Sequence, residues 1–118
     1  MKIYVETEIL FQFCEEKGEG RGYLAEIQSA EEQKRVEVIL SRTTFYWLGL
    51  TDQAREGSFM WQHSQTPLEW SNWIAAEPDD SHGNEDCVEM HIQGGKWGWN
   101  DLDCSNDHYP TYAFCEAN

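Results

Sequence analysis

The most constraining feature of this sequence is a concentration of acidic side chains between Trp73 and Cys104, where Lys96 is the only lysine or arginine. The side chains there that could ligate a cation include Glu77, Asp79, Asp80, Glu85, Asp86, Asn100, Asp101 and Asp103. Neighbouring carboxylates repel one another unless a cation lies between them. Calcium takes about six to eight oxygen ligands of these types in a flexible geometry. The pattern therefore predicts a calcium site on loops, with the function located at that cation.

The length and charge of the chain exclude several classes of protein. With 118 residues we expect one domain, residues 1–118. The net charge of −14 argues against nucleic acid or an anionic membrane as partner, and no window reaches the apolar length of a membrane span. No apolar signal peptide follows Met1, which we interpret as the start of a mature secreted domain, with an intracellular start as the alternative.

Four cysteines indicate an oxidising compartment. Cys14, Cys87, Cys104 and Cys115 form no C-x-x-C pair, which argues against a zinc knuckle or a thioredoxin motif. An even number of cysteines in a small, loop-rich chain favours two disulfides. The residues themselves leave all three possible pairings open.

Two helices are predicted in the first third of the chain. Apolar residues at near-helical spacing predict the first over residues 5–17, and a capping box at Ser29–Glu32 begins the second. The apolar face of the second helix is expected to comprise Val36, Ile39 and Leu40, with Arg42 placed favourably at its C-terminal end.

Short strands are predicted in the remainder, which is typical of an α+β fold. They cover residues 45–50, 59–62, 87–92 and 112–116, with turns at Gly57 and at Gly94–Gly95. Residues 64–84 show no regular period, and a loop of that length in a compact domain indicates a function.

A series of motifs then identifies a family. In order, the motifs are Cys14, GYLAEI (22–27), WLGL (47–50), WSNW (70–73), Glu77-Pro78-Asp79, Glu85-Asp86-Cys87, Trp99-Asn100-Asp101, Cys104 and Cys115. Each motif is weak alone, but their order and spacing are specific. From about Ile3 to Glu116 the chain resembles the C-type lectin domain, a non-enzymatic, calcium-dependent carbohydrate-recognition domain.

The resemblance implies the C-type lectin fold, with two helices, small antiparallel sheets and a long calcium-binding loop. It also implies disulfides Cys14–Cys115 and Cys87–Cys104, as in the short form of the domain, and a cis peptide bond before Pro78. The chain departs from the family at its N-terminus. The usual first strand is nearly absent, because Cys14 lies so close to Met1, and the extra disulfide of long-form members is missing.

Two calcium sites are implied by position in the family. The principal, sugar-binding site would use Glu77, Asp79, Glu85, Asn100 and Asp101, including the backbone carbonyl of Asp101. A second, structural calcium would be held by Asp52, Glu56, Asp80, Glu85 and Asp86. We therefore expect Ca²⁺ as the cofactor and glycans as the partner.

The specificity triplet Glu77-Pro78-Asp79 is a second departure, because the family uses Glu-Pro-Asn for mannose-type and Gln-Pro-Asp for galactose-type sugars. With both acids ionised, one sugar hydroxyl loses an amide donor worth about 0.5–1.5 kcal/mol. We expect strong metal binding with weaker or broader binding of mannose, glucose or N-acetylglucosamine. Trp97 could offer a stacking face, which keeps a galactose-type site as an alternative.

Several of these residues also have a structural or non-lectin interpretation. We expect Trp47, Trp70, Trp73 and Trp99 to lie in the core, and the histidines to be ordinary surface or satisfied groups. A glycosidase acid/base pair needs a carboxyl group in an apolar pocket, which this polar cluster does not provide. The sequence thus predicts a secreted lectin for microbial or other glycan surfaces, with a homo-oligomer as one arrangement. The rivals are domains that bind a non-sugar surface or a protein.

Overall fold

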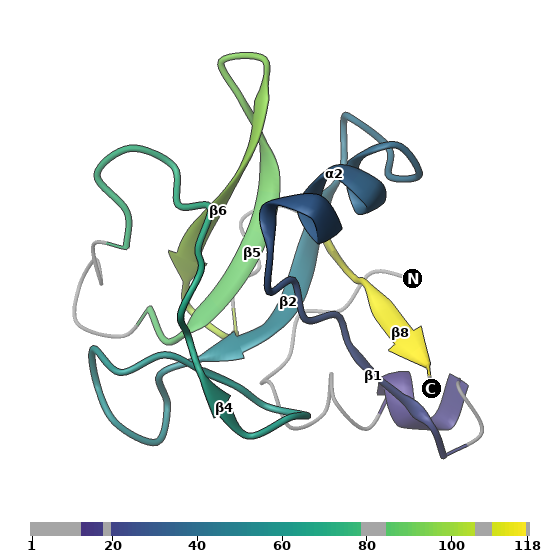
Figure 1. Ribbon diagram of the computed structural model, residues 1–118, viewed down its shortest axis with the longest axis vertical. Coiled ribbons are helices and arrows are strands. Elements are labelled where there is room, and N and C mark those ends of the chain that lie inside the picture. The colour runs from purple at the N-terminus through teal and green to yellow at the C-terminus, as the bar shows by residue number, and fades with distance from the viewer. Residues whose placement is uncertain (1–12, 18–19, 79–84, 106–109, 118) are drawn as a thin grey trace.

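The protein is described by a computed structural model that covers residues 13–17, 20–78, 85–105 and 110–117 (Figure 1). Residues 13–17 are helical. The further elements are β1 (Gly22–Leu24), α2 (Ala30–Glu37), β2 (Phe45–Thr51), β3 (Met60–Trp61), β4 (Thr66–Pro67), β5 (Cys87–Gln93), β6 (Lys96–Leu102), β7 (Thr111–Ala113) and β8 (Cys115–Ala117). The predicted α+β class is confirmed. Of the first predicted helix, residues 5–12 lie outside the described residues, as does the expected loss of an N-terminal strand.

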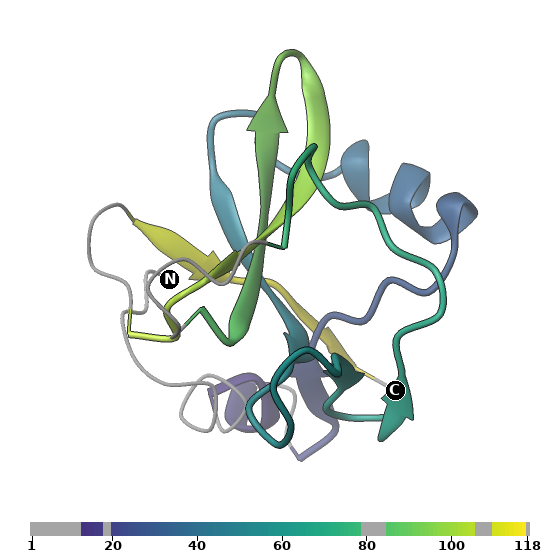
Figure 2. The ribbon, with the colours of Figure 1, turned by 90° about the vertical axis from the view of Figure 1, so that its left-hand side faces the viewer.

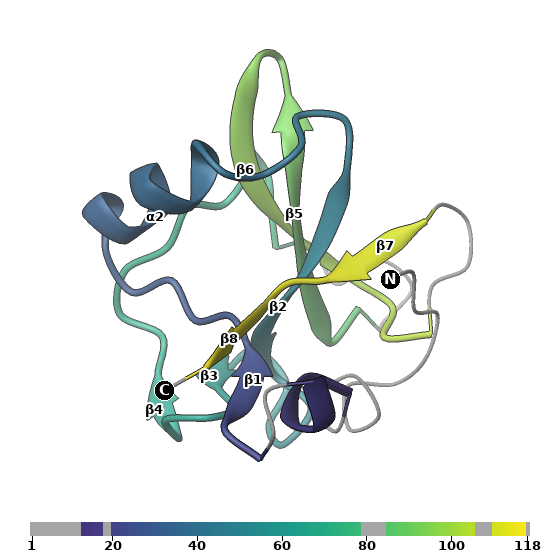
Figure 3. The same ribbon diagram turned by 90° about the vertical axis from the view of Figure 1, so that its right-hand side faces the viewer.

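The strands form two sheets. The larger has the order β4-β3-β2-β5-β6, and β7 adds to β2 as a parallel neighbour. The smaller is an antiparallel pair of β1 and β8 (Figure 3). β5 and β6 form a hairpin whose turn, Gly94–Gly95, has positive φ at both positions. Glycine is favoured in this turn because it takes positive φ without steric cost.

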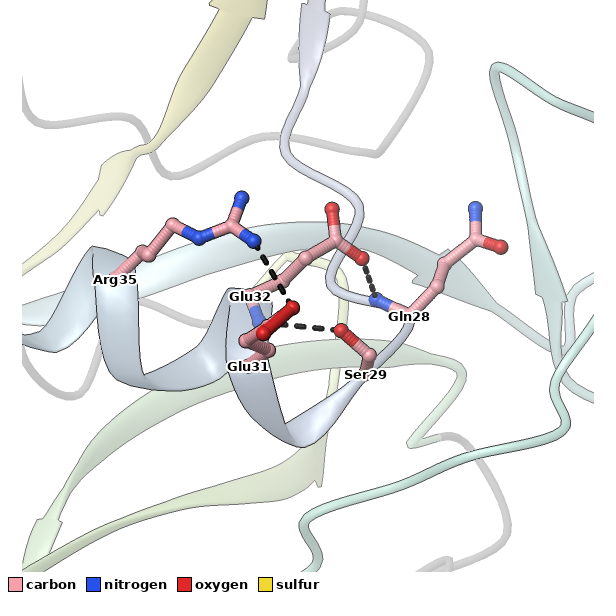
Figure 4. Close-up of polar contacts among 5 residues, drawn as sticks. All are labelled: Gln28, Ser29, Glu31, Glu32 and Arg35. Atoms are coloured by element: carbon pink, nitrogen blue, oxygen red, sulfur yellow. Dashed lines mark hydrogen bonds and ion pairs between the residues drawn. The ribbon is translucent and has the colours of Figure 1, made fainter.

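The start of α2 follows the sequence prediction (Figure 4). Ser29 is the N-cap, and its Oγ accepts a hydrogen bond from the backbone N–H of Glu32 at 3.1 Å. The Glu32 carboxylate accepts in return from the N–H of Gln28 at 2.9 Å. Arg35 and Glu31 form an exposed ion pair one turn apart, at 3.2 Å. These contacts satisfy donors that the first turn would otherwise leave open.

The end of α2 differs from the prediction. The helix stops at Glu37, so Ile39 and Arg42 lie beyond it, and Ile39 is 72% exposed rather than on the apolar face. Val36 and Leu40 do pack against the core, as expected. An 8-residue helix has too few turns for a periodic pattern to fix its C-terminus.

The core is aromatic and centres on Trp99. The rings of Trp61, Trp70 and Trp73 surround it edge to face, at 5.7, 5.7 and 5.8 Å between centroids. The Trp99 indole N–H donates to Gln33 Oε1 at 3.1 Å, which satisfies its one buried polar atom. The expectation of a core position is confirmed for Trp47 and Trp99, which are fully buried, and for Trp70 and Trp73, which pack against the core.

Two disulfides close the fold. Cys14 is bonded to Cys115 and Cys87 to Cys104, at sequence separations of 101 and 17 residues. These are the pairings that the family resemblance implies. The longer one joins the first helical segment to β8, and the shorter one joins the start of β5 to the chain just after β6.

Sequence patterns missed several strands. β1 and β4 have only 3 and 2 residues, too few to show a period, and the last predicted strand is in fact two, β7 and β8. Within the predicted irregular stretch, the chain passes beside β6 and forms a bridge between Trp73 and Trp99 (Figure 2). The Glu77–Pro78 peptide bond is cis.

Candidate functional site

Three carboxylates meet where β2 ends and β5 begins. Ligand oxygens of Asp52, Glu56 and Asp86 all lie within 4.8 Å of one another. Asp52 directly follows β2 and Asp86 directly precedes β5, and these two strands are antiparallel neighbours. The N–H of Asp52 donates to the carbonyl of Asp86 at 3.1 Å, and the Thr51 hydroxyl donates to the same carbonyl at 2.6 Å. The ends of the two strands therefore hold these acids together.

The chemistry of this cluster fits a hard cation. Asp52 is 2% exposed; its Oδ2 accepts from the N–H of Gly57 at 2.9 Å, whereas its Oδ1 is buried with no hydrogen-bond partner in the described part of the chain. A buried carboxylate oxygen without a partner is costly. A calcium ion would satisfy it, and the donor set consists only of oxygens, as calcium prefers. Asp80, a fourth predicted ligand of this site, lies outside the described residues.

Two of the residues predicted for the principal site lie on β6. Asn100 and Asp101 are adjacent on that strand, opposite Glu89 and Val88 of β5. Asp101 is 1% exposed, and Asn100 is partly exposed.

Backbone hydrogen bonds hold the segment just before Glu77 against the same strand. The N–H of Ile74 donates to the carbonyl of Trp99 at 2.9 Å, next to Asn100, and the N–H of Glu77 then donates to the carbonyl of Ile74 at 2.9 Å. Glu85 lies two residues before β5. Asp79 lies outside the described residues.

The structure contradicts the suggestion that Trp97 provides a stacking face. Its side chain belongs to the core cluster, is only 7% exposed, and packs near Tyr46 with 6.2 Å between ring centroids. Strand alternation explains the error, because Trp97 and Trp99 share the inward face of β6. We therefore remove Trp97 from the sugar-binding residues.

Sequence analysis also missed a buried acid beside Asn100. Glu89 is completely buried, lies opposite Asn100 in the β5–β6 register, and hydrogen-bonds to His91 Nδ1 through both carboxylate oxygens, at 2.8 and 3.0 Å. Burial raises the pKa of Glu89, against the lowering effect of its bonds to His91 and Asn100. For His91, burial works to lower the pKa, but the hydrogen bond and charge of Glu89 outweigh it, and the net pKa is raised. The sequence signal that could have revealed Glu89 is the presence of an acid inside the predicted strand 87–92.

The charge of Glu77 acts on this pair as well. It contributes to raising the pKa of His91, after the larger effects of burial and Glu89. Glu77 therefore lies close enough for its charge to act on His91.

Comparison with known proteins supplies the family. The profile of the Lectin C-type domain matches residues 7–117, nearly the whole chain. The chain belongs to the C-type lectin domain family. These domains are known as non-enzymatic carbohydrate-binding domains, so the expectation that the protein is not an enzyme follows from its family.

The relatives of this C-type lectin domain include named lectins. The domain is 39% identical over 111 residues to the alpha-N-acetylgalactosamine-specific lectin of Patiria pectinifera, covering 88% of this chain and 63% of that protein. A second relative is the salivary C-type lectin 2 of Aedes albopictus, and this chain covers 62% of that protein. The chain therefore spans less than two thirds of the length of both relatives.

Solved structures share the fold. The C-type lectin domain of murine dendritic cell inhibitory receptor 2, in complex with N-glycan, has a TM-score of 0.75 and 25% identity, covering 97% of this chain and 84% of that one. A calcium-independent type II antifreeze protein has a TM-score of 0.74 and 26% identity, covering 98% and 82%. Among the described helices of this chain, none has the length and apolar character needed to cross a membrane.

Proposed function

We propose that this C-type lectin domain binds glycans through calcium, at a principal site made by Glu77, Asp79, Glu85, Asn100 and Asp101. The observation that supports the proposal is the backbone bond that holds Ile74, three residues before Glu77, against Trp99 of β6, next to Asn100. These residues supply carboxylate and amide oxygens for a hard cation. When bound, calcium would offer open coordination positions to two sugar hydroxyls, and the Asn100 amide would donate a hydrogen bond to one of them.

A second calcium ion is proposed at Asp52, Glu56 and Asp86, with Asp80 and Glu85 as further ligands. The buried, unpartnered Oδ1 of Asp52 supports it. Because Asp52 directly follows β2 and Asp86 directly precedes β5, the second ion would neutralise repulsion between acids at the ends of two central strands. Its role would be structural, holding the loop that follows Glu77.

For the sugar, we propose equatorial diols of the mannose, glucose or N-acetylglucosamine type. Glu77 keeps the mannose-type order at the first position of the triplet. The burial of Trp97 adds support, because it removes the ring proposed for stacking on galactose. A galactose-type site remains the alternative, favoured by the relative from Patiria pectinifera that is specific for alpha-N-acetylgalactosamine.

Binding of a non-sugar surface or a protein partner is the second candidate. The similarity to a calcium-independent antifreeze protein favours it, because the same fold there works without the metal. A glycan array with calcium and with EDTA separates the candidates. Binding that needs calcium supports the lectin, whereas binding that persists in EDTA, or no binding to any glycan, supports the rival.

Two variants locate the site within that experiment. Asn100→Ala and Asp101→Ala each remove a proposed ligand, and both should abolish glycan binding while the disulfide-bonded fold remains. Asp79→Asn restores the missing amide donor and should strengthen mannose binding by about 1 kcal/mol at saturating calcium. An unchanged or lower mannose affinity in Asp79→Asn would show that the sugar binds in another orientation.

The setting of the protein is proposed from its chemistry. Two disulfides favour an oxidising, extracellular environment, so we propose a secreted lectin. A role in innate recognition of microbial glycans, with agglutination by a homo-oligomer, would be consistent with such a site. Size-exclusion chromatography with light scattering would measure the oligomeric state.

A further inference from the structure

Gly98 marks a close approach between β6 and the segment that leads to Glu77. It is buried in the middle of β6, opposite His91 of β5. A Cβ atom added at this position would lie 2.5 Å from Cγ1 of Ile74, which is closer than two carbon atoms can pack. A side chain at position 98 and Ile74 in its present place therefore exclude each other. Glycine weakens a strand, and one inside a strand often marks such an approach by another part of the chain.

Hydrogen bonds hold the same segment on both sides of Gly98. The N–H of Trp99 donates to the carbonyl of Asn72, and the N–H of Ile74 donates to the carbonyl of Trp99, both at 2.9 Å. The Asn72 side chain also donates from Nδ2 to the carbonyl of Trp97 at 3.1 Å. The segment is thus bonded to the residues before and after Gly98, and the Ile74 side chain packs at the position of β6 that has no side chain.

The turn from Ile74 to Glu77 depends on this anchor. The N–H of Glu77 donates to the carbonyl of Ile74 at 2.9 Å, which fixes the backbone of Glu77 relative to Ile74. Within the turn, Ala76 has a φ of 73°, a conformation that is unfavourable for a residue other than glycine. Such a conformation persists only where the surrounding structure holds it. The docking of Ile74 on β6 holds one end of the turn.

We propose that Gly98 is a positioning residue of the principal site, which acts by leaving room for Ile74 and so fixes the turn that carries Glu77. This inference rests on the proposed principal site. Gly98 itself would touch neither calcium nor sugar. Because Ile74 is β-branched and its χ1 is restricted, we expect a side chain at position 98 to displace the segment rather than merely rotate Ile74.

Gly98→Ala tests the proposal, because overpacking forces neighbouring side chains and backbone to shift. The double variant Gly98→Ala/Ile74→Ala should relieve the overlap, since the next atoms of Ile74, Cδ1 and the backbone N, would lie at an ordinary 3.5 Å from the added Cβ. Gly49→Ala is the matched control. Its added Cβ would also be too close to a neighbour, 2.7 Å from the carbonyl oxygen of Leu24, but its three nearest atoms all belong to Leu24.

Binding of mannose across a calcium titration is the functional measurement, made below the unfolding temperature of each variant. Loss of a group that supports a metal ligand typically lowers metal affinity 10- to 100-fold, so we expect Gly98→Ala to need about tenfold more calcium for half-maximal binding. The double variant should recover most of this loss. Gly49→Ala should keep the wild-type mannose affinity at saturating calcium, although it is less stable.

Three results would overturn the positioning role. These are a wild-type calcium requirement in Gly98→Ala, a loss in Gly49→Ala at saturating calcium as large as that in Gly98→Ala, and no recovery in the double variant. Each would show that the overlap with Ile74 does not control the principal site.

A metal-free measurement separates this proposal from the proposed function. In EDTA, hydrogen exchange by NMR should show the backbone N–H groups of Ile74 and Glu77 protected in the wild type and in the double variant, and exposed in Gly98→Ala. If the wild type binds neither calcium nor mannose but the protection changes in this way, the proposed function fails while the anchoring at Gly98 stands. Equal protection of these two groups in Gly98→Ala and the wild type would refute the anchoring.

Discussion

Replacing Asp52 by asparagine should change stability in opposite directions with and without calcium. The oxygens of Asp52, Glu56 and Asp86 lie within 4.8 Å of one another, so without a cation each pair repels. At that distance, with an effective dielectric constant of about 20, two unit charges repel by about 3.5 kcal/mol. Glu56 is exposed and well screened by water, which reduces its share.

After this discount we expect Asp52→Asn to raise the free energy of unfolding in EDTA by about 1–2 kcal/mol. Asparagine keeps an oxygen for the N–H of Gly57, loses the charge, and has an NH2 group in place of the second oxygen. For a chain of 118 residues, the gain corresponds to about 4–8 °C in Tm. In calcium the order reverses: a wild-type site at 100 times its Kd contributes about 2.7 kcal/mol, and the variant loses most of this.

Differential scanning calorimetry in EDTA and across a calcium titration measures both effects. Asp103→Asn is the control, because it also removes one charge and keeps an oxygen for the N–H of Ser105, yet lies outside the three-carboxylate cluster. The control should show the wild-type calcium response. An Asp52→Asn protein that is less stable than the wild type in EDTA, or that gains as much from calcium, would refute the reasoning.

Three further predictions concern the scaffold. Replacing Cys14 and Cys115 by serine should cost up to about 4.7 kcal/mol in chemical unfolding, because the disulfide closes a loop of 101 residues; a loss under 1 kcal/mol would contradict this. Gly49→Ala should destabilise by about 1–3 kcal/mol in the same assay, since its Cβ would lie 2.7 Å from the carbonyl oxygen of Leu24. Burial raises the pKa of Glu116, so the folded state binds the proton of this carboxyl group more tightly than the unfolded state does. The stability contributed by the protonated carboxyl group is lost as pH rises through the folded pKa. Glu116→Gln should therefore raise Tm at neutral pH, with the gain vanishing below about pH 4; a gain independent of pH would show another cause.

Local patterns in the sequence found elements whose signal lies within a few residues. The capping box at Ser29, the turn at Gly94–Gly95 and the long strands β2 and β5 are confirmed, because caps, turns and alternation depend on neighbouring positions, whereas β6 was not predicted. β1 and β4 were missed since strands of 2 or 3 residues have no period of their own. They form only because a partner strand is present.

For the site, the sequence indicated the chemistry and left the arrangement open. The acidic residues predicted a hard cation from composition, and the family resemblance assigned them to sites. That Asp52 and Asp86 share one cluster depends on the pairing of β2 with β5. The ligand roles of Asp79 and Asp80, outside the described residues, stay predictions.

What the sequence determined by itself is the class of fold, the cysteines available for two disulfides and a set of oxygen-rich side chains that could hold a cation. Only the tertiary structure decided that Trp97 is buried, which removes it from the sugar site, and that Glu89 lies beneath Asn100. The physical reason is that burial and hydrogen-bond partnership belong to pairs of residues on different strands. Register across the β5–β6 hairpin places an acid and an amide, 11 positions apart, directly opposite each other, and no local period in the sequence encodes that pairing.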